Sequence, residues 1–120
     1  MSRASQTGKT GEALAAEFLQ AKGYEIIARN FRAEAAELDI IAKDQGCLVF
    51  VEVKTCRSRS FGEPETWVDD RKVEHMTRAA DLYLEQNQLD DVDCRYDIIA
   101  VDLSGPQPDI RHLENAIWPD

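Results

Sequence analysis

Residues 37–54 contain two short apolar segments separated by the turn-forming run Asp44-Gln45-Gly46, and each segment carries charges at alternate positions. Side chains alternate between the two faces of a strand. Glu37 and Asp39 are therefore expected on one face of the first strand, with Leu38 and Ile40 on the other. Glu52 and Lys54 share one face of the second strand. The pattern predicts a β-hairpin with one mainly apolar face and with charges on the other.

The length of the turn determines which residues of the two strands face each other. A two-residue loop at Gln45-Gly46 and a four-residue loop over 44–47 give the same pairing, in which Asp39 lies opposite Glu52. Such cross-strand neighbours have Cβ atoms about 4.5 to 5.5 Å apart. A three-residue loop would instead pair Leu38 with Glu52 and mix apolar with charged residues on each face. We therefore predict the even loop and a facing pair of carboxylates.

Two carboxylates that face each other in an apolar sheet repel, and a buried unpaired charge costs on the order of several kcal/mol. A divalent cation between Asp39 and Glu52 would satisfy both, because magnesium prefers hard oxygen ligands. Lys54 would then be free to contact a phosphate oxygen or to orient an attacking water. This arrangement is typical of metal-assisted phosphodiester hydrolysis. The alternative is an internal ion pair between Lys54 and one of the two carboxylates.

Apolar periodicity predicts the elements around this hairpin. Helical spacing runs from a cap at Thr7 or Thr10 to a stop at Gly23, and a second helix begins at the capping residue Asp69. Strands are predicted over 24–29, 37–42, 47–54 and 95–103, followed by an edge strand or an arm over 110–117. The order αβββαβ predicts an α/β fold on a mixed sheet. We expect one domain over residues 1–120, with its core at about 8–103 and the edge strand or arm within 104–120.

Charge is distributed unevenly along the chain. Residues 1–60 contain nine Lys and Arg against eight Asp and Glu, whereas residues 61–120 contain five against fifteen. The overall net charge of −9 argues against a simple basic nucleic-acid or membrane-surface binder, so a site for a polyanion should use the first half. Arg57, Arg71 and Lys72 are candidate phosphate contacts around the predicted loop and helix start, although such charges are more often solvated surface.

The cysteines at positions 47, 56 and 94 are odd in number and have no C-x-x-C spacing. They indicate neither a disulfide framework nor a zinc site, and we expect reduced thiols in a cytoplasmic protein. The longest apolar run, Cys47–Val51, is far shorter than the ~20 residues that span a bilayer, so no membrane association is expected. Phe61 and Trp67 could stack on a base or, as is commoner in a small domain, cover the core.

Asp39, twelve intervening residues and then Glu52-Val53-Lys54 resemble the split D…E-x-K signature of the PD-(D/E)XK nuclease superfamily. A longer series of ordered blocks, extending from about Gly8 to Asp102, is similar to the bacterial YraN-like family of uncharacterised nuclease-fold proteins. The blocks are Gly11-Glu12-Ala13, Gly23-Tyr24, Asn30-Phe31-Arg32, Glu37-Leu38-Asp39-Ile40-Ile41, Phe50-Val51-Glu52-Val53-Lys54-Thr55, Phe61-Gly62, Val68, Lys72 and Arg95-Tyr96-Asp97.

This resemblance implies a restriction-endonuclease-like, three-layer core with a mixed central sheet. It also implies an endonuclease that cleaves DNA with Mg2+ or Mn2+, with branched or repair intermediates as the expected substrates. Asp39, Glu52 and Lys54 would be the catalytic residues, and the two carboxylates with the carbonyl of Val53 would hold the metal. The chain also resembles archaeal Holliday junction resolvases, in which a first-helix glutamate joins the metal site. Glu12 occupies the matching place, although an acid in the first turn of a helix is commonly just a favourable charge there.

Two positions depart from the pattern of the family. Ala36 stands where glycine usually precedes the Glu-x-Asp motif, and Cys56 stands where arginine usually follows the E-x-K strand. Glu37 shares the face of Asp39 but lies farther along the strand, so we expect it to support the site or face solvent rather than bind metal.

An acidic second half predicts weak DNA affinity unless a homodimer joins two first-half surfaces, as junction resolvases do. The alternative function is a catalytically inactive nuclease-fold module that binds nucleic acid or a protein partner. Fold-level similarity does not by itself establish a reaction.

Overall fold

The computed structural model describes residues 3–57 and 68–117, with side chains from residue 8 onward. Two helices and five strands follow one another along these residues. They are α1 (Arg3–Ala21), β1 (Glu25–Ala33), β2 (Ala36–Asp44), β3 (Cys47–Cys56), α2 (Asp70–Gln86), β4 (Cys94–Asp102) and β5 (Asp109–Leu113). The predicted order of elements is confirmed, and the last element is an edge strand.

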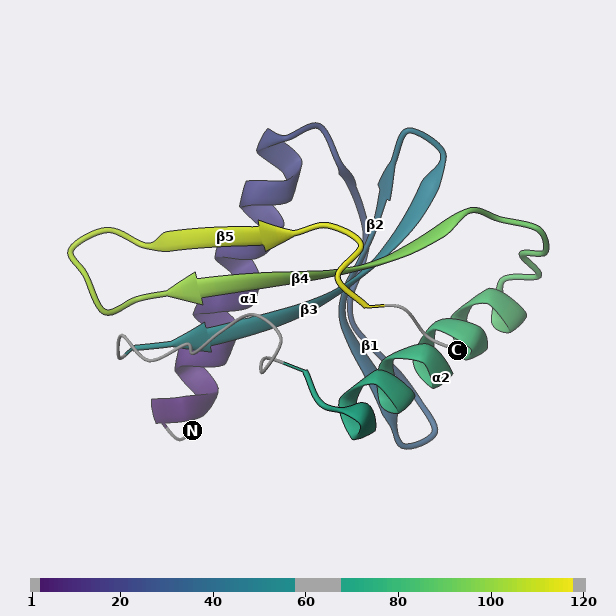
Figure 1. The fold of residues 1–120 in the computed structure, drawn as a ribbon, viewed down its shortest axis with the longest axis horizontal. Coiled ribbons are helices and arrows are strands. Elements are labelled where there is room, and N and C mark those ends of the chain that lie inside the picture. Colours follow the sequence, from purple (N-terminus) through teal and green to yellow (C-terminus); the bar gives the residue numbers. More distant parts are fainter. Residues whose placement is uncertain (1–2, 58–67, 118–120) are drawn as a thin grey trace.

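The five strands form one sheet in the order β1-β2-β3-β4-β5 (Figure 1). Strands β3 and β4 pair in parallel, and the other three pairs are antiparallel. A parallel pair needs a crossover connection, and α2 lies in the connection between β3 and β4. The sheet is therefore mixed, as the sequence predicts.

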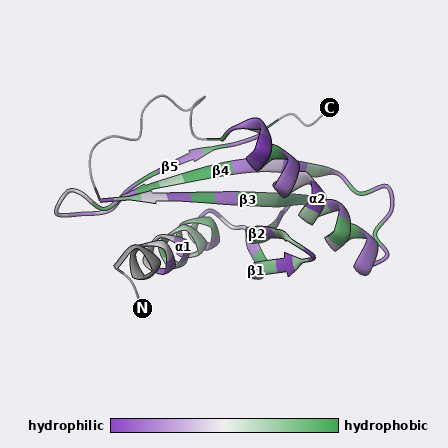
Figure 2. Cartoon of the chain, turned by 90° about the horizontal axis from the view of Figure 1, so that it is seen from below, coloured by the Kyte–Doolittle hydropathy of each residue, from purple (hydrophilic) through white to green (hydrophobic). Residues whose placement is uncertain are grey.

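The helices cover opposite faces of the sheet because consecutive residues of β3 point in opposite directions. Val49 and Val51 pack in one buried cluster with α1, and Leu48 and Phe50 pack in a second cluster with α2. Figure 2 shows α1 alongside one face of the apolar strands β3 and β4. Among the described residues, no helix is both long and apolar enough to cross a membrane.

The ends of most strands differ from the prediction by one or two residues, and the larger differences are at the start of α1 and at the ends of β1 and β5, which stops at Leu113 rather than at residue 117. Helix α1 begins at Arg3, so Thr7 and Thr10 lie inside it and the predicted caps are wrong. Threonine lowers the stability of a helix only slightly when it lies in the interior. A residue type that often caps helices therefore does not by itself mark where a helix starts. Strand β1 continues to Ala33 because β2 pairs with it up to the Ala33–Ala36 pair. The predicted cap of α2 is confirmed, since Asp69 accepts the backbone N–H of Lys72 at 2.9 Å.

A buried acidic residue anchors β5 and the segment after it. The Asp97 side chain is fully buried and accepts hydrogen bonds from Arg95 at 2.9 and 3.0 Å, from the ring of His112 at 2.7 Å and from the backbone N–H of Asn115 at 2.8 Å. These hydrogen bonds lower the pKa of Asp97 against the opposing effect of burial. His112 is only 3 % exposed, so this histidine, which has no partner in its sequence spacing, is a structural member of the cluster.

Candidate functional site

The hairpin of β2 and β3 has the predicted register. Ile40 pairs with Val51, so Asp39 and Glu52 are the next facing positions beyond the last regular pair of the ladder. At this point the backbone N–H of Val53 donates to a side chain, the carboxylate oxygen Oδ2 of Asp39, at 2.8 Å. This hydrogen bond orients Asp39 toward the strand that carries Glu52.

Strand β2 changes direction at Asp39. Leu38 packs in the cluster of α2, whereas Ile40 packs in the cluster of α1. The expectation that Leu38 and Ile40 share one face is therefore wrong, because regular alternation is interrupted between them. In Figure 1, β1 and β2 run steeply across the direction of β4 and β5. Asp39 thus stands at the bend, half-buried, between a residue that packs toward α2 and one that packs toward α1.

Helix α1 brings Glu12 to this bend, and Gly11 permits the approach. A Cβ atom on Gly11 would lie 1.8 Å from Oγ1 of Thr55, so only glycine lets α1 pack this close to β3. The Glu12 carboxyl group lies close enough to Asp39 for the charge of Asp39 to raise its pKa. Glu12 therefore lies beside the hairpin carboxylates, where the resemblance places it.

The carboxyl groups of Glu12, Asp39 and Glu52 form a row with Asp39 in the middle. Burial, followed by the hydrogen bond and negative charge of Asp39, raises the pKa of Glu52 to about 8. Burial and then the charge of Asp39 also raise the pKa of Glu12. At neutral pH Glu52 therefore retains its proton, chiefly because its side chain is buried and next because Asp39 lies nearby.

The cation that contacts Glu52 is Lys72 from α2. Its Nζ lies 3.2 Å from Oε2 of Glu52, whose side chain is 13 % exposed. Partial burial alone would lower the pKa of Lys72, but the charge of Glu52 and the hydrogen bond to it outweigh burial and raise that pKa. The sequence interpretation of Lys72 as a surface phosphate contact omits this ion pair, which depends on how α2 packs on the sheet.

Lys54 lies two residues beyond Glu52 on β3, is half-buried and is level with Ala100 of β4. Ala100 belongs to the cluster of α2, so Lys54 and Glu52 share that face of the sheet. Among the described residues, no carboxylate lies within ion-pair distance of Lys54. The alternative prediction, an ion pair between Lys54 and one of the two carboxylates, is therefore wrong. Lys72 pairs with Glu52 instead.

The other predicted residues lie around the row. Glu37 is exposed and pairs with Arg32 at 3.5 Å, and its charge also acts on Lys72. Arg57 and Arg71 are exposed, directly after β3 and in the first turn of α2. The loop residues Phe61 and Trp67 lie outside the described residues.

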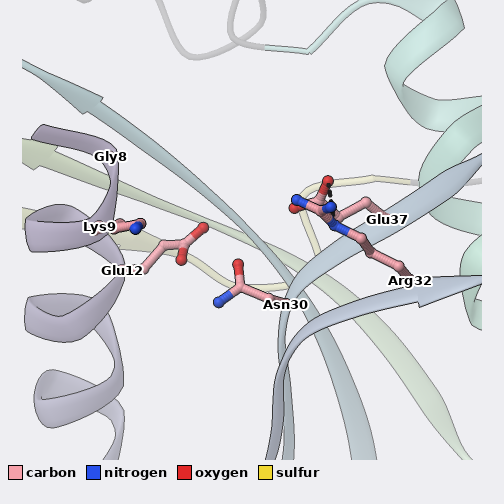
Figure 3. Close-up of a pocket in the computed structure, with 6 residues that line it drawn as sticks. All are labelled: Gly8, Lys9, Glu12, Asn30, Arg32 and Glu37. Atoms are coloured by element: carbon pink, nitrogen blue, oxygen red, sulfur yellow. Dashed lines mark ion pairs between the residues drawn. The ribbon is translucent and has the colours of Figure 1, made fainter. Parts of the chain in front are cut away.

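An open cleft of about 430 Å³ borders the row at Glu12. It lies between α1 and the β1–β2 hairpin, and it is lined by Gly8, Lys9, Glu12, Asn30, Arg32 and Glu37 (Figure 3). Asn30 is not among the predicted site residues, yet its side chain points toward Glu12 across the gap. Nothing in the sequence marks Asn30, because the predicted strand ends at residue 29 and asparagine is common in the turns that follow strands.

Oxygen donors of the kind that Mg2+ and Mn2+ prefer are present in the row. In the part of the chain that the structure describes, however, no three His, Cys, Asp or Glu side chains converge as a ready-made metal group. The reason lies in the layers: α1 and α2 cover opposite faces, so Glu12 and Glu52 reach Asp39 from different sides. The donor chemistry fits a divalent cation, and Asp39 with Glu52 is the pair best placed to hold one.

The comparisons with known proteins agree on one family. The model of the uncharacterised protein family UPF0102 matches residues 11–101, which include the whole row of carboxylates. A UPF0102 protein of Trichlorobacter lovleyi is 45% identical over 91% of this chain and 87% of its own length. One from Dehalococcoides mccartyi is 41% identical over 93% of both chains, and one from Symbiobacterium thermophilum is 48% identical over 88% of this chain and 87% of its own. The chain therefore belongs to the uncharacterised protein family UPF0102.

Proposed function

We propose that this protein is a divalent-cation-dependent endonuclease that hydrolyses phosphodiester bonds of DNA at the Asp39 row. One observation carries the proposal. The Asp39 carboxylate accepts the N–H of Val53 and faces Glu52, its charge acts on both Glu12 and Glu52, and Lys72 pairs with Glu52. Glu12 and Glu52 are partly buried acids with raised pKa values beside a cleft, and such acids are frequent in catalytic sites.

The fold is part of the same proposal. We infer a restriction-endonuclease-like core of the YraN-like, PD-(D/E)XK type. The supporting observations are the element order, the mixed sheet with a parallel β3–β4 pair, and helices on both faces. The hairpin register that sets Asp39 opposite Glu52 supports it further.

Asp39 and Glu52 would hold Mg2+ or Mn2+, with Glu12 and the carbonyl of Val53 as further candidate ligands. When bound, the ion would supply positive charge to the scissile phosphate and lower the pKa of a bound water. Glu52 must release its proton to bind a cation, and Lys72 at 3.2 Å favours that release. Lys72 would thus have two functions. It compensates the negative charge of Glu52 in the absence of a metal, and it would lie close to a phosphate bound at the site.

Lys54 would orient the attacking water or stabilise the charge that develops on the phosphate. Its half-buried position on the face of Glu52 suits this role, and no described carboxylate neutralises its ammonium group. Arg57 and Arg71, both exposed, would bind flanking phosphates without reading bases. Because residues 61–120 are strongly acidic, we expect DNA to be bound by a homodimer, with branched or repair intermediates as substrates.

The second candidate is an inactive nuclease-fold module that binds nucleic acid or a protein. This candidate is favoured by the ion pair of Lys72 with Glu52, because the lysine partly compensates the negative charge of the carboxylates without a metal.

A cleavage assay with metal titration tests the proposal. The purified full chain is incubated with Mg2+ or Mn2+ and linear, single-stranded, flapped and four-way DNA. Asp39→Asn should abolish metal binding and cutting, and Lys54→Ala should abolish cutting alone. Lys43→Ala, an exposed lysine of the same hairpin, and Asp81→Asn on α2 are the matched controls and should cut like wild type. Metal binding without any product would favour the inactive module, and the absence of metal binding would refute both the cofactor and the reaction.

A further inference from the structure

Asn30 occupies an unusual position in β1, directly across from the central acid of the row. The pairs Arg29–Ile40 and Phe31–Leu38 flank it, so Asn30 and Asp39 are the facing positions between them. Asn30 has φ +54°, in the left-handed region, although it lies inside a strand. Glycine, asparagine and aspartate tolerate this region best, so few residue types fit here without strain.

The Asn30 side chain reaches the first helix. With its amide nitrogen turned toward Glu12, it donates to Oε1 at 3.2 Å and to Oε2 at 3.0 Å. This orientation is the one that gives both ends of the amide a suitable partner. Figure 3 shows the two side chains directed toward each other across the gap between α1 and β1.

This contact has a specific consequence for Glu12. The Glu12 carboxyl group lies beside the Asp39 carboxyl group, and like charges favour a rotamer that separates them. The neutral amide of Asn30 opposes that separation, because it binds both oxygens of Glu12 from the strand that faces Asp39. Asn30 is exposed and lines an open cleft, so the contact is not a by-product of core packing.

We propose that Asn30 is a positioning residue that holds the Glu12 carboxylate against Asp39, so that Glu12 can take part in binding a divalent cation. The part of this inference that concerns the cation rests on the proposed function. Outer hydrogen bonds of this kind typically change metal affinity by about 10- to 100-fold.

Asn30→Gly is the informative variant, because glycine keeps the left-handed backbone and removes only the amide. Asn115→Gly is a matched control, since Asn115 also has a positive φ, +53°, but lies in the turn after β5. Mn2+ affinity of the full-length protein is measured by calorimetry for both variants, for Glu12→Gln and for the double variant Asn30→Gly with Glu12→Gln. Thermal unfolding checks that each variant is folded.

We expect Asn30→Gly to weaken Mn2+ binding about tenfold, Asn115→Gly to leave it unchanged, and Asn30→Gly to have no further effect once Glu12 is glutamine. Wild-type affinity in Asn30→Gly, or additive effects in the double variant, would overturn the inference. If the wild type binds no Mn2+, the proposed function fails. The positioning of Glu12 by Asn30 is then tested on the metal-free protein by NMR. An Asn30 side-chain amide NMR signal that shifts in Glu12→Gln supports positioning, and an unmoved signal refutes it.

Discussion

The free energy of unfolding should fall as pH rises toward 8, and Glu52 should be the main cause. Burial, then the hydrogen bond and charge of Asp39, raise the pKa of this 13 % exposed side chain from 4.5 to about 8. Between these values the folded protein holds a proton that the unfolded chain releases, so stability falls with rising pH. At about 1.4 kcal/mol per pKa unit, the effect reaches at most about 5 kcal/mol by pH 8.

Glu52→Gln tests this reasoning, because glutamine keeps the size of the side chain and cannot ionise. Urea unfolding at pH 5 to 9 without divalent metal should show a flatter profile for the variant, with equal stability near pH 5 and a more stable variant at pH 8. Glu37→Gln is the control, since Glu37 is 43% exposed and pairs on the surface with Arg32. Parallel profiles for wild type and Glu52→Gln would refute the proposed burial of Glu52 against Asp39.

Three further changes test other parts of the structure. Asp97→Asn removes a fully buried charge that accepts four hydrogen bonds and should lower the free energy of unfolding by about 3 to 5 kcal/mol in urea denaturation; a loss under about 1 kcal/mol would contradict the cluster. Gly11→Ala meets Thr55 and should cost about 1 to 3 kcal/mol, most of it recovered beside Thr55→Gly; equal losses in both backgrounds would argue against the close approach. Lys72→Met should raise the pKa of Glu52 further in a carboxyl NMR titration, and an unchanged pKa would mean that the 3.2 Å ion pair is not formed in solution.

The hairpin and its register could be predicted because they depend on local chemistry. A turn at Gln45-Gly46 and alternating charges admit only one pairing that keeps apolar and charged faces apart, and Ile40–Val51 is that pairing. The α/β order follows from the same periodicity. The cap at Asp69 was also predictable, since it involves a backbone N–H only three residues away.

The partners of the site could not be predicted, because they come from distant elements. Lys72 rather than Lys54 pairs with Glu52, and which lysine does so depends on how α2 packs on the sheet. Likewise, His112 shows no partner in its sequence spacing, yet it contacts Asp97 because β5 lies beside β4.

The sequence by itself determined where carboxylates face each other, because strand alternation and a short turn act over a few residues. Only the tertiary structure decided how they are arranged and charged. Strand β2 changes face at Asp39, and Gly11 lets α1 pack close enough to β3 to bring Glu12 near Asp39. Burial and the nearby charge of Asp39 raise the pKa values of Glu12 and Glu52, and no local sequence pattern encodes the distance between the packed layers that causes this.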